Sequence, residues 1–227
     1  MAVTGWDPMA SDAGAPTDTV VKAVFSDYPD PDTVGLSSMS LTTGVYRVPE
    51  AYRVDLAAKA VVMTPDSLLT PLLGYAANVS PGLTSLAGCG VTFTQNRFST
   101  GDGAANLPVP PVPTSADVQA IFSASCTAGC HADPTGGCLA APAGGLSLCA
   151  SEARAALVDV PAREVSSLAR VAPRDSARSY LLRKLLPATV GGGPIPGTLG
   201  QREPPGDPLS PDQLETITAW IDGGALL

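Results

Sequence analysis

A proline-rich stretch near the middle of the chain separates two different sequence patterns. Residues 102–114 read DGAANLPVPPVPT, and four of the six residues 108–113 are proline. Prolines at this density favour the extended polyproline II conformation, which acts as a semi-rigid spacer. Before this stretch apolar and polar residues tend to alternate, and after it the apolar residues follow a helical period. The chain is therefore predicted to form two domains joined by a linker over residues 102–114.

The first half has the pattern of a β-sandwich. Short segments with apolar and polar residues in alternation are separated by turn residues, at positions 20–25, 38–41, 45–48, 52–56, 59–63, 75–79 and 91–98. Turn signals that recur every few residues between such segments are typical of antiparallel sandwiches. Residues 18–101 are predicted to form this all-β domain. Residues 1–17 are mostly small and polar, and they are expected to be a flexible N-terminal segment.

The order of these segments resembles a known family. The sequences AYRVDLAAKAVVMTP, DSLLTPLLGYAANVSPGLTSLAG and RFSTGD follow one another as they do in the bacterial Ig-like domain of surface-layer and secreted proteins. That family usually has Asp and Asn in the turn after the Tyr-containing strand, and Ser85 and Cys89 stand at those positions here. The resemblance implies an Ig-like fold for residues 18–101.

The second half, residues 115–227, has the pattern of an all-α domain. Residues that commonly cap helix N-termini precede four apolar segments, at Thr114 or Ser115, Ser151, Asp175 or Ser176, and Ser210. The last segment starts with Ser210-Pro211-Asp212-Gln213, which combines a capping box with proline at the first helical position. Four short helices are therefore expected.

One motif in this half carries metal chemistry. Cys126-Thr127-Ala128-Gly129-Cys130-His131 contains the only histidine of the chain. Two cysteine thiols can add to the vinyl groups of a heme as thioethers, and the imidazole that follows can then bind the iron. The usual spacing is Cys-x-x-Cys-His, so this motif has one additional residue.

The surrounding segments resemble class I cytochromes c, and more narrowly the monoheme domains of proteins secreted by environmental bacteria. The resemblance is carried by VQAIFSASCTAGCH, GLSL, RVAPRDSARSYLLRKLL and PPGDPLSPDQLETITAWIDGGA, in this order. It implies one covalently attached heme c, held by Cys126 and Cys130 with His131 as the proximal iron ligand. It also implies that the loop at Pro142 presents a carbonyl to the His131 ring. Residues expected to pack on the heme, or simply to fill the core, are Phe122, Leu146, Tyr180, Leu181, Leu185 and Trp220.

This chain departs from the family at the sixth iron ligand. The family has a Met-Pro pair in the loop before the last helix, but no methionine follows Met63 here. Ile195-Pro196 or Glu203-Pro204 stands in its place. Loss of the thioether sulfur predicts a lower reduction potential and an open or weakly bound distal position. Water, Lys184 or a residue from the first domain are the candidates to fill that position.

Two further cysteines, Cys138 and Cys149, flank the segment between the motif and the second helix. They are interpreted as a disulfide that fastens this loop, with a metal or redox role as the alternative. Cys89 has no evident partner and is either a buried apolar side chain or a free thiol.

Composition limits the partners. The formal net charge is −8, which disfavours nucleic acids and anionic membranes and favours a basic redox partner protein. No apolar run is long enough for a transmembrane helix. The cysteine usage is typical of an oxidising compartment, so we expect a periplasmic, cell-surface or secreted protein whose signal peptide has been removed.

These observations predict an electron carrier rather than an enzyme, with the Ig-like domain as spacer or docking module. The first alternative is a five-coordinate heme sensor or a weak peroxidase, suggested by the missing methionine, although no second histidine is available as a distal acid–base group. The second alternative is a surface or adhesion protein with a degenerate cytochrome fold that holds no heme.

Overall fold

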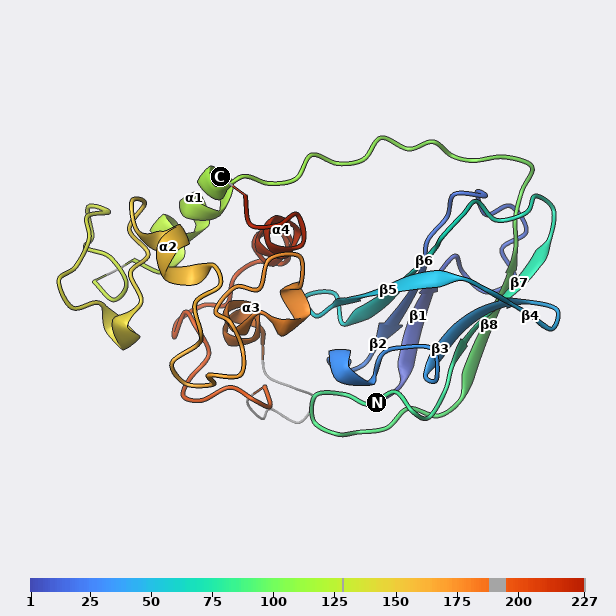
Figure 1. The fold of residues 1–227 in the computed structure, drawn as a ribbon, viewed down its shortest axis with the longest axis horizontal. Helices are drawn as coiled ribbons and strands as arrows, with labels where there is room; N and C mark the ends of the chain where they lie inside the picture. Colours follow the sequence, from blue (N-terminus) through green and yellow to red (C-terminus); the bar gives the residue numbers. More distant parts are fainter. Residues whose placement is uncertain (128, 188–194, 227) are drawn as a thin grey trace. The chain divides into compact units, whose positions relative to one another are not determined.

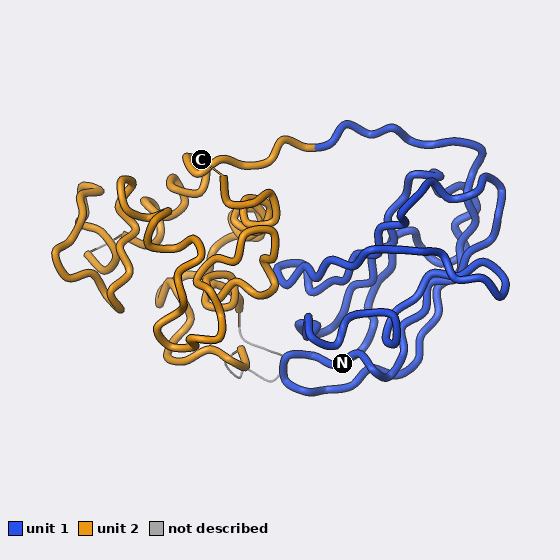
Figure 2. Tube along the Cα trace, viewed as in Figure 1, with its two compact units in different colours: residues 1–109 blue, residues 110–227 orange. Residues whose placement is uncertain are grey.

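The computed structural model describes residues 1–127, 129–187 and 195–226. The chain divides into two compact units, residues 1–109 and residues 110–227 (Figure 2). The boundary lies within the proline-rich stretch 102–114. Each unit has its own buried apolar core, and each is described separately below.

Unit 1 is an all-β sandwich of two four-stranded antiparallel sheets (Figure 1). The order in the first sheet is β1 (Val3–Asp7), β2 (Val21–Phe25), β6 (Ala60–Pro65) and β5 (Glu50–Asp55). The order in the second sheet is β4 (Tyr46–Val48), β3 (Met39–Thr43), β7 (Gly74–Val79) and β8 (Thr94–Ser99). Alternate residues of β2 and β7 are buried, as the sequence alternation predicts for strands with one face on a core.

The N-terminal segment corrects the expectation of a flexible stretch over residues 1–17. Strand β1 pairs with β2, and the residues that follow it continue along the opposite sheet. There Ser11 donates a backbone hydrogen bond to Arg97, and Ala15 donates one to Ser99. Asn96 Nδ2 also donates to the Pro8 carbonyl at 2.9 Å. The sequence does not reveal this strand because it lies at a sheet edge, where backbone pairing rather than an apolar face holds it.

A buried polar cluster links the two sheets where β4 leads into β5. The Glu50 side chain is fully buried, and its Oε1 accepts from Arg47 Nη2 at 3.0 Å. The Tyr52 hydroxyl lies 2.6 Å from the same Oε1 and 3.0 Å from the Met39 carbonyl of β3. Burial and the Glu50 carboxylate raise the pKa of Tyr52 to about 12. Among the described residues, Glu50 Oε2 has no hydrogen-bond partner, so this carboxylate depends on the two donors at Oε1.

The start of the proline-rich stretch is tied to unit 1. The Asp18 carboxylate accepts backbone hydrogen bonds from Ala105 at 2.8 Å and from Asn106 at 2.9 Å. These bonds lower the pKa of Asp18. The segment up to residue 106 is therefore held against the sandwich rather than acting as free spacer.

The described residues of unit 2 form four α-helices: α1 (Ser115–Ser125), α2 (Ala153–Leu157), α3 (Tyr180–Leu185) and α4 (Pro211–Asp222). Both longer helices, α1 and α4, begin at capping boxes, which are formed by Thr114 with Asp117 and by Ser210 with Gln213. Within unit 2, α4 is in contact with α1 and with α3, and Phe122 of α1 and Trp220 of α4 are buried in the core. The first and last helices of unit 2 are therefore in contact.

The remainder of the described part of unit 2 is mostly loop, so these few helices do not make the all-α domain that the sequence predicts. The helix predicted from Asp175 is split into a 3-10 turn, Ser176–Arg178, and α3. Ser179 interrupts it, because its hydroxyl accepts from the Ala172 amide and donates to the Asp175 carbonyl, both at 2.9 Å. A serine that bonds to nearby backbone in this way competes with helix continuation. Among the described residues, none of the helices has the length and apolar character needed to cross a bilayer.

Replacing Tyr52 by Phe should weaken unit 1, because the buried Glu50 carboxylate then loses one of its two donors. The expected loss is about 1–3 kcal/mol, the usual cost of an unsatisfied buried polar group. Hydrogen exchange of the β3 and β5 amides in the full chain measures it. Tyr46→Phe is the matched control, because Tyr46 is exposed. Equal protection in both variants would show that the cluster does not stabilise the sandwich.

Candidate functional site

The Cys-His motif begins where α1 ends. Cys126 is the C-cap of α1, and its amide donates to the Phe122 carbonyl at 2.8 Å. Thr127 is buried and donates through its hydroxyl to the Ser123 carbonyl at 2.8 Å. The Cys130 amide then donates to the Thr127 carbonyl at 3.0 Å. The helix thus fixes the start of the motif, while Ala128 lies outside the described residues.

The His131 ring is oriented by a backbone carbonyl. Nδ1 lies 2.9 Å from the Leu146 oxygen. A carbonyl can only accept, so this contact assigns the ring hydrogen to Nδ1 and leaves the lone pair of Nε2 for a ligand. The backbone of the same segment is fastened as well, because the Leu148 amide donates to the His131 carbonyl at 2.9 Å.

The carbonyl that orients His131 is not the one expected. The resemblance points to Pro142, but the Pro142 carbonyl accepts from the Gly145 amide at 2.9 Å. The reason is a tight turn at Gly144 and Gly145, which have φ angles of +60° and +69°. These left-handed conformations suit glycine, and they reverse the chain so that Leu146 reaches the ring instead.

Cys126, Cys130 and His131 all line one cavity of about 820 Å³ in unit 2. This volume falls within the roughly 300–1,000 Å³ that is typical of cofactor and small-molecule sites. Much of the wall is apolar and comes from several segments of unit 2: Leu146, Leu148, Leu157, Ala162, Leu181 and Leu185. The three residues that the sequence selects for their chemistry are therefore brought together around one apolar space.

The other predicted site residues divide into two groups. Leu146, Tyr180, Leu181 and Leu185 line the cavity. Phe122 and Trp220 are buried in the core but are not among the lining residues, so their packing role is between helices.

The structure also separates the two segments that could replace Met-Pro. Ile195 is buried and is not part of the cavity wall, whereas Glu203 and Pro204 line it. Glu203 also raises the pKa of the Cys126 thiol, together with the larger effect of burial, to about 11. Cys126 is therefore a protonated thiol at neutral pH, unlike the activated thiolate of a cysteine nucleophile.

Charged groups lie at the same cavity. Arg163, Arg170 and Lys184 line it, and Arg170 donates to the Ala156 carbonyl at 2.8 Å. The Tyr180 hydroxyl donates a short hydrogen bond to Glu164, and burial and this carboxylate raise the pKa of Tyr180 to about 12. Sequence reasoning did not select Arg163, Glu164 or Arg170. The sequence feature that could have indicated these residues is the segment PAREVSSLAR. It carries charged side chains in a chain in which only 15% of the residues are charged.

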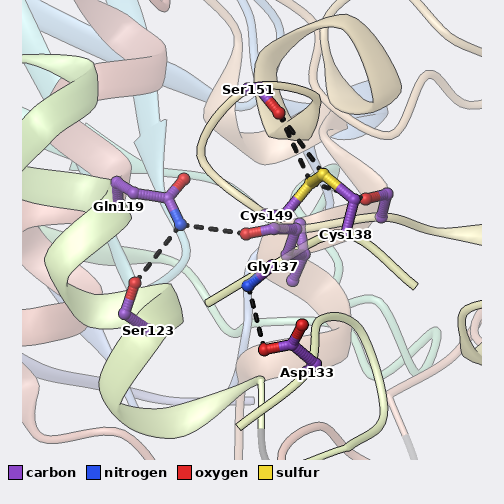
Figure 3. Close-up of a disulfide and its surroundings, with 9 residues drawn as sticks. Gln119, Ser123, Asp133, Gly137, Cys138, Cys149 and Ser151 are labelled. Carbon is purple, nitrogen blue, oxygen red and sulfur yellow. Dashed lines mark hydrogen bonds between the residues drawn. A yellow bond between two sulfur atoms is a disulfide. The ribbon is translucent and has the colours of Figure 1, made fainter. Parts of the chain in front are cut away.

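Cys138 and Cys149 are joined in a disulfide, the pair that the sequence suggested (Figure 3). The loop that they close is fixed to α1 by Gln119, whose Nε2 donates to the Leu148 carbonyl at 2.9 Å. Asp133 stabilises the turn just before Cys138 by accepting from the Gly137 amide at 3.0 Å. Both sulfurs lie near Glu152, but atoms bonded to each other are not thiolate ligands, so this group is structural rather than a metal site. Cys89 is a free, exposed thiol.

Comparison with known proteins concerns unit 1. Residues 1–100 match the family described as the bacterial Ig-like domain, in agreement with the sandwich fold and including strand β1. No curated protein matches the chain.

Solved structures with distant similarity include the S-layer protein rSbsC(31-844), with 21% identity and a TM-score of 0.36; the match covers 50% of this chain and 14% of that one. The copper resistance protein PcoC from Escherichia coli has 17% identity and a TM-score of 0.36, covering 43% of this chain and 97% of that one. CopC from Methylosinus trichosporium OB3b has 20% identity and a TM-score of 0.37, covering 47% and 97%.

Removing the disulfide by Cys138→Ala with Cys149→Ala should destabilise unit 2. Opening a loop of 11 residues' separation is expected to cost about 3 kcal/mol in the chain-entropy view. Hydrogen exchange of residues 131–149 in the oxidised full chain should show lost protection. Cys89→Ala, which removes a free thiol, should leave the protection unchanged. If both variants exchange alike, the disulfide does not hold this loop.

Proposed function

We propose that unit 2 binds one heme covalently and serves as a one-electron carrier outside the cytoplasm. Cys126 and Cys130 would form the thioethers, and His131 would bind the iron. The proposal rests on one observation above all: these three side chains converge on a single apolar cavity, with the His131 ring already oriented by Leu146.

The cavity residues fit the requirements of this group. Cys126 and Cys130 are both free, and Cys126 remains a thiol, the form whose S–H adds across a vinyl double bond. The apolar wall would hold the porphyrin plane. Arg163 and Arg170 would be available near its carboxylate side chains, because guanidinium pairs well with carboxylates. When bound, the heme would supply a one-electron couple whose iron gains one electron as a reduced partner loses one.

The chain's own contribution is ligation and environment. The Leu146 carbonyl holds the hydrogen on His131 Nδ1, which presents Nε2 as the ligand and increases the basicity of the ring. The apolar wall limits contact between the site and water, and both effects tune the potential of a bound metal centre.

A location outside the cytoplasm is supported by the bacterial Ig-like match of unit 1 and by the disulfide of unit 2, which persists in oxidising compartments. Unit 1 would then serve as spacer or docking module. The net charge of −8 favours a basic redox partner protein.

A second candidate function is a five-coordinate heme protein that binds a small ligand. The observation that favours it is the absence of methionine after Met63. The two functions share the proximal side and differ only in what occupies the opposite side of the iron. A surface or adhesion protein without heme is the outcome that would reject both.

The full chain, produced with heme-attachment machinery and an export signal, should carry one heme that remains bound after denaturation. Pyridine hemochrome spectra and intact mass measure this. Cys126→Ala and Cys130→Ala should each leave a single thioether, which shifts the reduced band, and the double variant should lose covalent heme. Cys89→Ala is the control and should retain both thioethers. A chain exported without any bound heme would contradict the proposal.

A further inference from the structure

Lys184 lines the cavity but its ammonium group is fully engaged. Nζ donates to the Leu199 carbonyl at 2.8 Å and to the Gln201 carbonyl at 2.6 Å, and it lies 3.6 Å from Glu164 Oε2. Two of the three donors of the ammonium group are therefore used by carbonyls, and its charge is paired with the Glu164 carboxylate. The side chain is 12% exposed. Freeing its nitrogen for iron would therefore break two hydrogen bonds and an ion pair, which makes Lys184 a poor candidate for the distal position.

The same contacts of Lys184 also hold a loop that lies further along the chain. This distal loop, residues 195–209, is held by the two carbonyls at Lys184 Nζ and by the Leu199 amide, which donates to the Tyr180 hydroxyl at 3.2 Å. The Glu203 amide donates to the Lys184 carbonyl at 2.8 Å. Residue 203 is thus fastened to α3 through its own backbone as well as through its neighbours.

The backbone of Glu203 is held by α3, and its side chain lines the cavity. It is partly buried and lines the wall together with Pro204. Among the described residues, its carboxylate has no hydrogen-bond or ion-pair partner. His131 reaches the same cavity from a different segment, the one fastened by Leu146. Within the part of the chain that the structure describes, a carboxylate without a partner on one segment and an imidazole without a partner at Nε2 on the other therefore line the same cavity.

We infer that Glu203 is the side chain that faces the iron's sixth position in the loaded protein, and that Lys184 is a positioning residue that holds the distal loop. This inference rests on the covalent heme of the proposed function, which the electron carrier and the five-coordinate heme protein share. A carboxylate oxygen is a weaker-field ligand for heme iron than the thioether sulfur, which raises the potential of methionine-ligated cytochromes c. The iron is therefore expected to be high-spin and, once reduced, to bind small neutral ligands such as carbon monoxide.

The test uses the full chain matured with its heme, examined by absorption spectroscopy and redox titration. The unmodified protein should have a high-spin ferric spectrum, and its reduced spectrum should shift on addition of carbon monoxide. Glu203→Met places a thioether directly before Pro204, which recreates the Met-Pro pair. It should give a low-spin spectrum, weaker carbon monoxide binding and a higher potential.

Glu215→Met is the matched control, because it makes the same side-chain change at an exposed position of α4 that does not line the cavity. It should leave the spin state and the potential of the unmodified protein. Lys184→Ala should also keep the high-spin spectrum, since its nitrogen is not a ligand, but it should increase hydrogen exchange in residues 195–209.

Specific results would overturn the inference. A low-spin ferric protein that becomes high-spin in Lys184→Ala would make Lys184 the ligand. A Glu203→Met variant with the spectrum and potential of the unmodified protein, at equal heme content and equal far-ultraviolet circular dichroism, would show that residue 203 does not face the iron. Heme content separates these results from failure of the proposed function, because a chain without heme rejects that function itself.

Discussion

The hydrogen bond between His131 Nδ1 and the Leu146 carbonyl determines which ring nitrogen can bind a ligand, and the surrounding loop is built to maintain it. The turn at Gly144 and Gly145 brings the carbonyl to the ring. The Cys138–Cys149 disulfide closes the loop, and Gln119 fastens it to α1. Cys126 lies at the end of the same helix, α1, and Cys130 follows it directly before His131. The proximal side of the proposed site is therefore a pre-organised unit rather than a flexible loop that a cofactor would have to order.

A second set of contacts holds the distal loop, and it is centred on α3. Lys184 binds two carbonyls of that loop and lies near Glu164, which in turn accepts from Tyr180. Helix α3 therefore does more than supply apolar surface to the cavity: it also holds the segment that carries Glu203. The two walls of the cavity are thus held by different means: a covalent link on the His131 side and a polar network on the Glu203 side.

Sequence patterns predicted those parts of the fold that depend on local spacing. Alternation located seven of the eight strands of unit 1. The sequence also predicted the capping box of α4 at Ser210 and a cap for α1 at Thr114 or Ser115. Strand β1 was missed because edge strands are held by backbone pairing. The predicted third helix is split because the Ser179 hydroxyl bonds to backbone groups of the preceding residues Ala172 and Asp175. In each case the deciding interaction involves backbone groups, which the pattern of side chains does not record.

For the candidate site, the sequence by itself determined the chemistry available: two thiols and the only imidazole of the chain, within six residues, and no methionine after Met63. Only the tertiary structure decided how that chemistry is arranged. It selected Leu146 rather than Pro142 to orient His131, placed Glu203 rather than Ile195 at the cavity, and engaged Lys184 elsewhere. The physical reason is that a motif depends on neighbours along the chain, whereas these contacts join segments that are brought together only by folding.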